Sequence, residues 1–301
     1  MSARQRLTQE LVRLHAAMQT EHACTFEQAL VSDEINLPDE QVAVRQACRM
    51  LGFVEEDVQL LDQAWQRQSQ RTGHFDPHHW PDEPQDFDIA PWPRTKAFAP
   101  CPQSLGLYAV LPDAQWVARM AQAGVPTVQL RFKSTDLEAV RREVRAAVQA
   151  VKGTRSLLFI NDHWQIAMEE GAYGVHLGQE DMDDAQLETI RHAGLRLGLS
   201  THGYGELLRA QAVSPSYLAL GAVFATTLKK MKTAPQGLGR LGAYARLMRG
   251  RSLVAIGGID LSAVPDVMRT GVGSIAVVRA ITAADQPEQA AQDFQRAMQS
   301  V

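Results

Sequence analysis

The chain has 301 residues, enough for one large domain or two smaller ones, and its composition is ordinary for a soluble globular protein. The net charge of −4 indicates no basic nucleic-acid face, and no apolar run approaches the ~20 residues that span a bilayer. We therefore expect neither a nucleic acid nor a membrane as a partner. The N-terminus lacks the apolar core of a signal peptide, which predicts a cytoplasmic protein. The three cysteines are widely spaced and should be reduced thiols.

Residues 1–70 read as a small all-α extension of unknown role. Leu7, Leu11, Leu14 and Met18 recur at helical spacing, and further helices are expected after Pro38 and after residues 55–57. The first 100 residues carry 9 Lys and Arg against 16 Asp and Glu, a balance of −7, and the remainder carries 21 against 18, a balance of +3. This acidic extension is a candidate surface for a homo-oligomer or a protein partner, and the mildly positive remainder suits an anionic small molecule.

Residues 71–104 form a proline-rich linker, or a strap that lies on a neighbouring surface. Seven prolines exclude regular structure there, and interleaved aromatic side chains favour the strap. His74, Asp76, His78 and His79 could bind a metal, but no second ligand cluster follows at metal-site spacing, which favours a solvated loop.

From residue 105 to residue 301, short apolar strands alternate with helical segments. We predict strands over 105–111, 127–133, 156–162, 174–178, 196–202, 217–223, 253–259 and 274–281. Alternating strands and helices form a parallel sheet, and eight such units closing on themselves form a (β/α)₈ TIM barrel. A doubly wound open sheet is the alternative; a Gly-x-Gly-x-x-Gly turn after the first strand would favour it, but the chain reads Leu111-Pro112-Asp113 there.

Polar side chains cluster where the predicted strands end, which is the active-site end of a barrel. Gln129, Arg131 and Lys133 alternate along the second strand and should share one face. Two cations and an amide suit a phosphate or diphosphate, because the guanidinium grips two oxygens and the ammonium adds a point charge.

Two aspartates follow the next strands. Asp162 ends the third strand and Asp181 lies just past the fourth, with Glu180 as a further candidate ligand. Carboxylates facing a cationic cluster indicate a Mg²⁺ site, because Mg²⁺ takes one or two carboxylates with water and substrate phosphate. The alternative to the metal site is a structural network of charged side chains. For the cation cluster, the alternative is a salt-bridged barrel interior in which Arg131 pairs with Asp162, and this pairing can coexist with phosphate binding.

The later strand ends supply a second set of phosphate-binding groups. Ser200 can donate to a phosphate oxygen, and His202 is either an acid/base group or a packed loop histidine. Residues 224–232 offer hydroxyls and lysines to a phosphate, or form a solvated loop. Gly257-Gly258 allow close backbone approach, and strand eight ends at Val278-Arg279. Two phosphate regions suit an enzyme that joins a diphosphate substrate to a phosphate substrate.

A series of longer motifs occurs in order along the same region: Val128-Gln129-Leu130-Arg131-x-Lys133, Phe159-Ile160-Asn161-Asp162, Gly174–Asp181, Gly198-Leu199-Ser200-Thr201-His202, Ala234-Pro235-Gln236-Gly237 and Ala255-Ile256-Gly257-Gly258-Ile259. With these motifs, residues 105–298 resemble the thiamine phosphate synthase family. The resemblance implies a barrel enzyme that joins hydroxymethylpyrimidine diphosphate to hydroxyethylthiazole phosphate. It also implies Mg²⁺ as cofactor and a dissociative release of diphosphate.

The resemblance also assigns residues. It implies that the pyrimidine diphosphate is held by Gln129, Leu130, Arg131, Phe132, Lys133, Asn161, Ser200 and Lys229, of which Arg131, Lys133, Ser200 and Lys229 act on the leaving group. It implies that Asp162 and Asp181 bind Mg²⁺. The thiazole phosphate would be held by Thr226, Thr227, Leu228, Gly258, Val278 and Arg279.

Two of these positions depart from the family pattern, and both lie on the thiazole-phosphate side. Leu228 stands where the family usually has a second threonine, and Arg279 where it usually has serine. Two alternatives therefore accompany the synthase. One is a superfamily member resembling the thiazole tautomerase, which needs one phosphate site and a proton-transferring histidine. The other is a catalytically retired barrel that acts as a ligand sensor.

Overall fold

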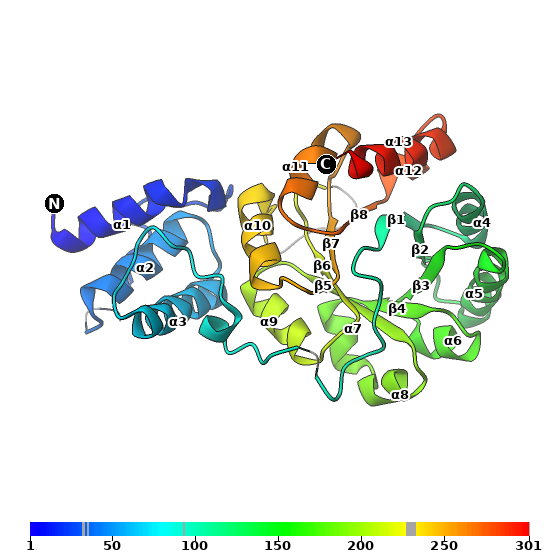
Figure 1. Cartoon of the computed structure of the whole chain (residues 1–301), viewed down its shortest axis with the longest axis horizontal. Coiled ribbons are helices and arrows are strands. Elements are labelled where there is room, and N and C mark those ends of the chain that lie inside the picture. Colours follow the sequence, from blue (N-terminus) through cyan, green and yellow to red (C-terminus); the bar gives the residue numbers. More distant parts are fainter. Residues whose placement is uncertain (32–33, 35, 93, 227–232, 301) are drawn as a thin grey trace.

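Eight parallel strands close into a barrel in chain order, with β8 pairing to β1 (Figure 1). The computed structural model describes residues 1–301 except 32–33, 35, 93, 227–232 and 301. The strands are β1 (Gly106–Leu111), β2 (Thr127–Leu130), β3 (Leu157–Asn161), β4 (Gly174–Leu177), β5 (Arg196–Thr201), β6 (Tyr217–Leu220), β7 (Leu253–Ile256) and β8 (Ser274–Val277). The predicted TIM barrel is confirmed, and the open-sheet alternative is wrong because the first and last strands are hydrogen-bonded to each other.

Helices cover the outside of the barrel between the strands. They are α4 (Ala114–Gln122), α5 (Leu137–Val151), α6 (Trp164–Glu169), α7 (Gln179–Asp184), α8 (Leu187–His192), α9 (Tyr204–Ala212), α10 (Gly237–Leu247), η4 (Leu261–Ala263), α11 (Val264–Arg269), α12 (Arg279–Thr282) and α13 (Pro287–Gln299). Helices α7, α10 and α12 were not predicted, and the first residues of α12 had been expected in the last strand. Several strands also end earlier than predicted: β2 stops at Leu130 and β8 at Val277.

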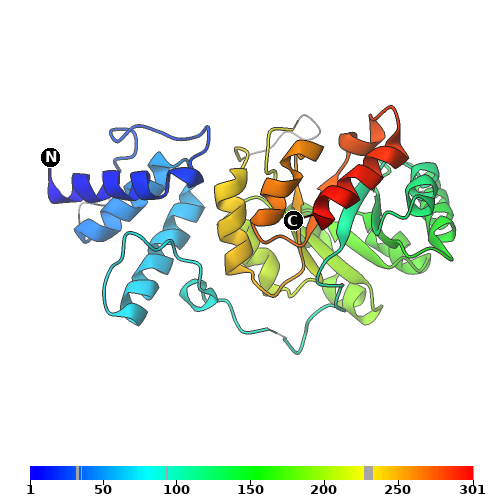
Figure 2. The ribbon, with the colours of Figure 1, turned by 45° about the horizontal axis from the view of Figure 1, so that its top comes forward.

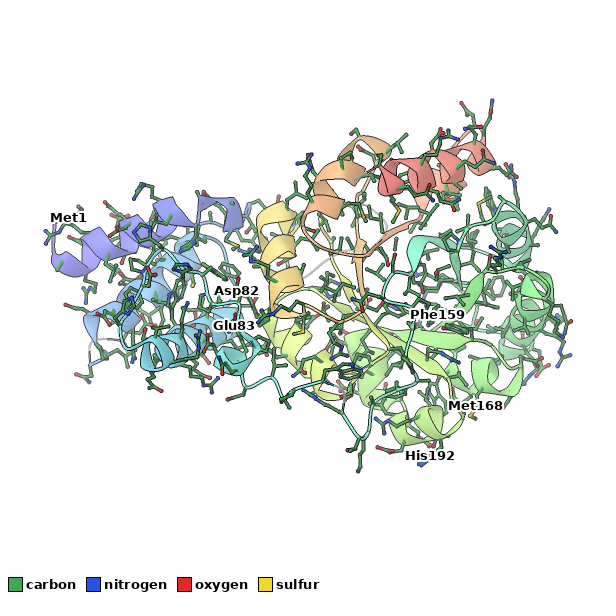
Figure 3. All side chains as sticks on the ribbon, in the orientation of Figure 1. Met1, Asp82, Glu83, Phe159, Met168 and His192 are labelled. Atoms are coloured by element: carbon green, nitrogen blue, oxygen red, sulfur yellow. The ribbon has the colours of Figure 1, made fainter. Side chains whose placement is uncertain are left out.

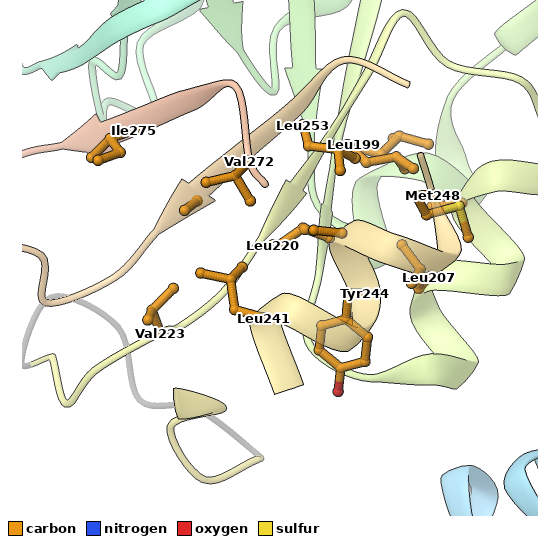
Figure 4. Packing of buried hydrophobic residues seen from close by; sticks show 14 of the residues in the cluster. Leu199, Leu207, Leu220, Val223, Leu241, Tyr244, Met248, Leu253, Val272 and Ile275 are labelled. Carbon is orange, nitrogen blue, oxygen red and sulfur yellow. The ribbon is translucent and has the colours of Figure 1, made fainter. Parts of the chain in front are cut away.

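The barrel has an inner and an outer core. Its interior is filled by Leu105, Tyr108, Val110, Phe159, Tyr217, Ala219, Val254 and Ala276. On the outside, apolar side chains of α9 and α10 join the outward-facing strand side chains in one cluster, as Figure 4 shows for Leu241 near Leu220 and Val223. This alternation of strand side chains between an inner and an outer core is what closed parallel sheets require.

The N-terminal helices form a separate layer beside α9 and α10 (Figure 2). They are α1 (Ala3–Leu14), η1 (Ala16–Met18), α2 (Asp39–Met50) and α3 (Glu55–Thr72). Acidic residues occupy the first turn of α3, and the helix ends at Gly73 with φ of 84°, both normal terminus signals. We call residues 3–72 the N-terminal helical unit. Its buried side chains and the outer core of the barrel form one continuous hydrophobic cluster.

A second contact between this unit and the barrel is made by Trp80, just after α3. Its indole nitrogen donates to the hydroxyl of Tyr204 at 2.8 Å, and its ring packs on His15, Phe53 and Trp65. Trp80 and Tyr204 are both buried, and burial of one such side chain contributes roughly 1.5–3 kcal/mol. The N-terminal helical unit is therefore packed on the barrel by apolar contact as well as by polar groups.

The proline-rich segment contains η3 (Pro84–Phe87) and then runs along the amino-terminal end of the barrel. Asp82 and Glu83 lie beside α10 (Figure 3), where Arg246 donates to Asp82 and Arg249 to Glu83. Farther along, the Phe98 amide donates to Ser214 O at 3.0 Å, and the Ser104 hydroxyl donates to Gly273 O. The segment thus lies on a neighbouring surface, as the strap alternative describes.

Other sequence expectations concern single residue types. Cys24, Cys48 and Cys101 are free thiols. In the loop after α3, Asp76 accepts hydrogen bonds from the His78 amide and the His79 ring. The Asp76 carboxylate is therefore engaged within the loop itself. In the part of the chain that the structure describes, no helix is long and apolar enough to cross a bilayer.

Candidate functional site

Amide side chains from β2 and β3 meet at the carboxyl end of the barrel. Gln129 precedes the last residue of β2 and Asn161 ends β3, and the two strands are paired. The Gln129 amide donates to Asn161 Oδ1 at 2.8 Å, although Gln129 is only 4% exposed. This bond satisfies two polar groups inside the barrel and fixes both amides in one orientation.

The cations that follow β2 differ in their partners. Lys133 Nζ lies 2.7 Å from Asp162 Oδ2. Among the described residues, Asp162 is therefore paired with Lys133 rather than with Arg131. The Arg131 backbone amide donates to Leu111 O at 2.7 Å, while its guanidinium makes no hydrogen bond or ion pair with any described residue. Within the described residues, its side-chain donors are open to an anion.

The pKa of the His163 imidazole is influenced by the charges of Asp162, Asp181 and Lys133. Partial burial lowers the pKa of His163, the two carboxylates oppose that shift, and Lys133 adds to it. Asp162 is held with φ of 63° at the end of β3, and Asp181 lies in the first turn of α7, where its Oδ2 accepts from the Gly178 amide. The two aspartates predicted as metal ligands thus belong to one electrostatic neighbourhood.

These two carboxylates fit a hard divalent cation. Mg²⁺ commonly takes one or two protein carboxylates and completes its shell with water and phosphate oxygens. Among the residues described, no group of three or more His, Cys, Asp or Glu side chains is placed to hold a metal, so a fully protein-built cage is not present there. The donor set matches a cation shared with a phosphate substrate.

Ser200 lies at the end of a buried chain of hydrogen bonds. Its hydroxyl is 2.8 Å from His176 Nε2, the other ring nitrogen is 2.7 Å from the Tyr217 hydroxyl, and that hydroxyl is 2.8 Å from the hydroxyl of Tyr108. Gln179 holds the Ser200 backbone carbonyl at 2.7 Å. Burial raises the pKa of both tyrosines, so they remain neutral. The Ser200 hydroxyl is therefore oriented from the barrel interior.

Sequence reasoning missed the side chains that support the site. His176 lies between Val175 and Leu177 on β4, and the side chains of these two neighbours are in the outer core. Because successive strand side chains point to opposite faces, this alternation was the available signal that His176 faces inward. His163 directly follows Asp162, but nothing in the residue pattern indicated that both carboxylates would influence its pKa. Gln179 gave no recognisable signal either.

The predicted thiazole-phosphate residues come from the ends of β6, β7 and β8. Gly258 has φ of 64°, and a Cβ there would lie 2.5 Å from Ala225 O, so the backbone after β7 approaches the residue before Thr226 very closely. The Phe224 amide donates to Gly257 O at 2.9 Å, which pairs the two segments. Val278 precedes α12, and Arg279 is its exposed first residue.

Some predicted residues do not converge on the site or cannot be placed. Leu130 is 2% exposed in the outer core, and Phe132 packs against that core, so their side chains face away from the barrel interior. His202 lies 2.6 Å from Glu206 in α9, which favours the packed loop histidine. Thr227, Leu228 and Lys229 lie outside the described residues.

Comparison with known proteins gives consistent results. Residues 107–281 match the family model described as thiamine monophosphate synthase. A thiamine-phosphate synthase of Neisseria meningitidis is 54% identical over 198 residues, which span 66% of this chain and 97% of that protein. One of Cronobacter sakazakii is 51% identical over 190 residues, or 63% of this chain and 90% of that protein. The solved thiamine phosphate pyrophosphorylase of Pyrococcus furiosus is 26% identical with a TM-score of 0.59, and covers 65% of this chain and 96% of that one.

Proposed function

The chain belongs to the thiamine monophosphate synthase family, and we propose that it is a transferase of thiamine biosynthesis that condenses 4-amino-2-methyl-5-(diphosphooxymethyl)pyrimidine with hydroxyethylthiazole phosphate. The products are thiamine phosphate and diphosphate. The observation that carries the proposal is the gathering of Gln129, Asn161, Lys133, Asp162 and Ser200 at one end of the barrel, within the residues that match the family. The names of the curated relatives favour the synthase over the tautomerase-like and sensor alternatives.

On the donor side, the described residues offer charge and hydrogen bonds to a diphosphate. Arg131 supplies a guanidinium, Lys133 an ammonium, and Ser200 a hydroxyl held by His176. The bond from the pyrimidine methylene to the diphosphate oxygen breaks, and the electron pair leaves with the diphosphate. Groups that stabilise this leaving charge lower the barrier, because they bind it more strongly in the transition state than in the ground state. A strong base is not required for this step.

Asp162 and Asp181 are the residues that would hold Mg²⁺. The cation would supply positive charge next to the diphosphate oxygens. Lys133 already balances the Asp162 carboxylate and would be drawn to the incoming phosphate oxygens.

On the acceptor side, the thiazole nitrogen gives its lone pair to the pyrimidine methylene carbon and forms the new C–N bond. The acceptor phosphate would be held by Thr226, the Gly258 backbone, the Val278–Arg279 backbone and the Arg279 guanidinium. Arg279 is exposed and replaces a serine hydroxyl of the family with a charged fork, which suits a phosphate dianion.

The direct test is product formation by the purified full-length chain with Mg²⁺ and both substrates. We expect diphosphate release that depends on both substrates, with stoichiometric thiamine phosphate. The control omits the thiazole phosphate. Diphosphate release without the acceptor, or none at all while the pyrimidine diphosphate binds, would contradict the proposed acceptor.

Asp181→Asn tests the metal assignment, with Asp183→Asn as its matched control. Both residues lie in α7, but the Asp183 carboxylate is paired with Arg209 on α9. We expect Asp181→Asn and Asp162→Asn to raise the Mg²⁺ concentration needed for half-maximal turnover by at least tenfold, because loss of one ligating carboxylate weakens a site that has only two. Asp183→Asn should leave it unchanged. Equal Mg²⁺ dependence of all three variants would refute the assignment.

A further inference from the structure

The first turn of α10 is tied to the segment that follows β6. The Gln236 amide donates to Ala222 O at 2.8 Å, and the Gly237 amide donates to Val223 O at 2.9 Å. The Gln236 side chain is 3% exposed, and its carbonyl oxygen accepts from the Tyr244 hydroxyl at 2.8 Å. Any shift of this turn therefore moves the backbone at Ala222 and Val223.

That segment is one wall of the proposed acceptor-phosphate site. Beyond the strand ends, the Val223 amide donates to Ile256 O and the Phe224 amide to Gly257 O, both at 2.9 Å. A Cβ on Gly257 would lie 2.5 Å from Ala222 Cβ, so the two backbones are in close contact. We call residues 222–226 with Gly257-Gly258 the acceptor wall.

The N-terminal helical unit holds the same turn of α10 from the opposite side through Arg240. This residue is 3% exposed; its Nε donates to Met18 O at 2.9 Å, and its Nη2 donates to Leu51 O at 3.0 Å. Its guanidinium lies 3.6 Å from the centroid of the Phe53 ring. One buried cation thus joins α10 to three positions in the extension, and Arg240 Nη1 also lies 3.5 Å from Gln236 Oε1.

Backbone contact accompanies these bonds at Gly239. A Cβ at this position would lie 2.5 Å from Ala17 C and closer still to Ala17 O. Real side chains essentially never approach other atoms within 3.0 Å, so η1 and α10 can be this close only because residue 239 is glycine. Figure 4 shows Leu241 and Tyr244 on the same helix, with Leu241 directed toward Val223.

We propose that the N-terminal helical unit is a positioning element of the acceptor site: through Arg240 and the contact at Gly239, it fixes the first turn of α10 and with it the acceptor wall. The inference rests on the proposed function for the identity of the ligand, a thiazole phosphate. Arg240 and Gly239 touch no substrate in this scheme and act through Gln236 and residues 222–223.

The test uses Gly239→Ala in the full-length chain, with Gly242→Ala as its matched control. Both changes add one methyl group to α10, but a Cβ on Gly242 would meet only Arg246 Nη1 at 3.4 Å and Thr270 Cβ at 3.9 Å. A misplacement on the order of 1 Å in substrate-holding groups can cost up to about 100-fold. We expect Gly239→Ala to raise KM for the thiazole phosphate by about tenfold and to change kcat and KM for the pyrimidine diphosphate less than about twofold. Gly242→Ala should match the wild type.

A second readout does not depend on catalysis. Hydrogen exchange of peptides covering residues 222–226 should be faster in Gly239→Ala than in Gly242→Ala and the wild type, because displacement of the backbone at Ala222 and Val223 would weaken the hydrogen bonds from the Val223 and Phe224 amides to Ile256 O and Gly257 O. One outcome separates the two proposals. If the wild type and both variants all fail to make thiamine phosphate, but exchange rises only in Gly239→Ala, the proposed function is refuted and the positioning role stands. Unchanged exchange in a folded Gly239→Ala variant overturns the positioning role.

Arg240→Lys covers the case in which Gly239→Ala does not fold. Lysine keeps the charge but cannot donate to both Met18 O and Leu51 O in the geometry of the guanidinium. We expect the same selective rise in KM for the thiazole phosphate. Equal losses for both substrates, or loss of kcat alone, would show that the N-terminal helical unit contributes only general stability, and would overturn the inference.

Discussion

Asp57 is the buried acid at which a pH effect on stability should be largest. It lies in the first turn of α3, is 3% exposed, and accepts from the Gly205 amide at 2.9 Å at the start of α9. Burial raises the pKa of this carboxyl from its ordinary 3.8 to about 6, while the hydrogen bonds from the Gly205 and Tyr204 amides oppose the shift. Asp57 therefore caps a barrel helix from the N-terminal helical unit, at a cost in desolvation.

The sign of the pH effect follows from the two pKa values. Because the folded-state pKa is the higher one, the folded chain binds the proton more tightly between about pH 4 and pH 6. The stabilisation is complete below the unfolded value and is lost as pH rises through the folded value. A rise from 3.8 to about 6 corresponds to ~3 kcal/mol at 1.36 kcal/mol per pH unit.

Asp57→Asn removes this titration and keeps one oxygen for the Gly205 amide. We expect the free energy of unfolding of the wild type, minus that of Asp57→Asn, to fall by ~2 kcal/mol between pH 4 and pH 7, because part of the full effect is already lost at pH 4. Urea denaturation at several pH values measures it, and the subtraction cancels the other titrating groups. Glu56→Gln removes one negative charge from the same helical turn and is the control. A flat difference, or an equal slope for Glu56→Gln, would refute the reasoning.

Two further predictions concern the interior and the mouth of the site. Tyr217→Phe should lower the free energy of unfolding by ~1–3 kcal/mol, because it removes the hydroxyl that bonds to the buried Tyr108 hydroxyl and to His176 Nδ1. Urea denaturation measures this, and no loss of stability would contradict the hydrogen-bond chain. Arg279→Ser should raise KM for the thiazole phosphate and leave KM for the pyrimidine diphosphate nearly unchanged. Steady-state kinetics measure both constants, and equal effects would show that Arg279 does not face the acceptor.

The barrel could be predicted because its strand ends follow a simple rule. Buried apolar runs stop at polar residues, and in parallel sheets those ends lie on one side. Asn161 and Asp162 were assigned correctly to a strand end, where the Gln129 amide bonds to Asn161. The pairing of Asp162 could not be predicted, because sequence alternation does not decide between Arg131 and Lys133. Both lie beyond the last residue of β2, where strand alternation no longer constrains them.

The contacts of residues 1–104 could not be predicted, because they depend on long-range packing. Asp57 was read as an ordinary acidic residue in the first turn of its own helix, whereas its carboxylate accepts a hydrogen bond from Gly205, 148 residues away. Trp80 was read as part of a strap, and its partner Tyr204 is 124 residues away in the chain. Cytoplasmic location, the oligomeric state and a protein partner for the extension stay predictions.

The helix that the sequence concealed is the one that joins the two parts of the chain. Three glycines at 237, 239 and 242 weaken the helical propensity of α10, since each costs about 1 kcal/mol relative to alanine, and they hide its helical pattern. Tertiary contact explains one of them, because any side chain at position 239 would collide with Ala17. A local propensity that disagrees with the observed structure marks here a surface on which another part of the chain packs. The N-terminal helical unit should therefore be treated as part of the barrel that it touches, and the glycine at position 239 as the residue that permits the contact.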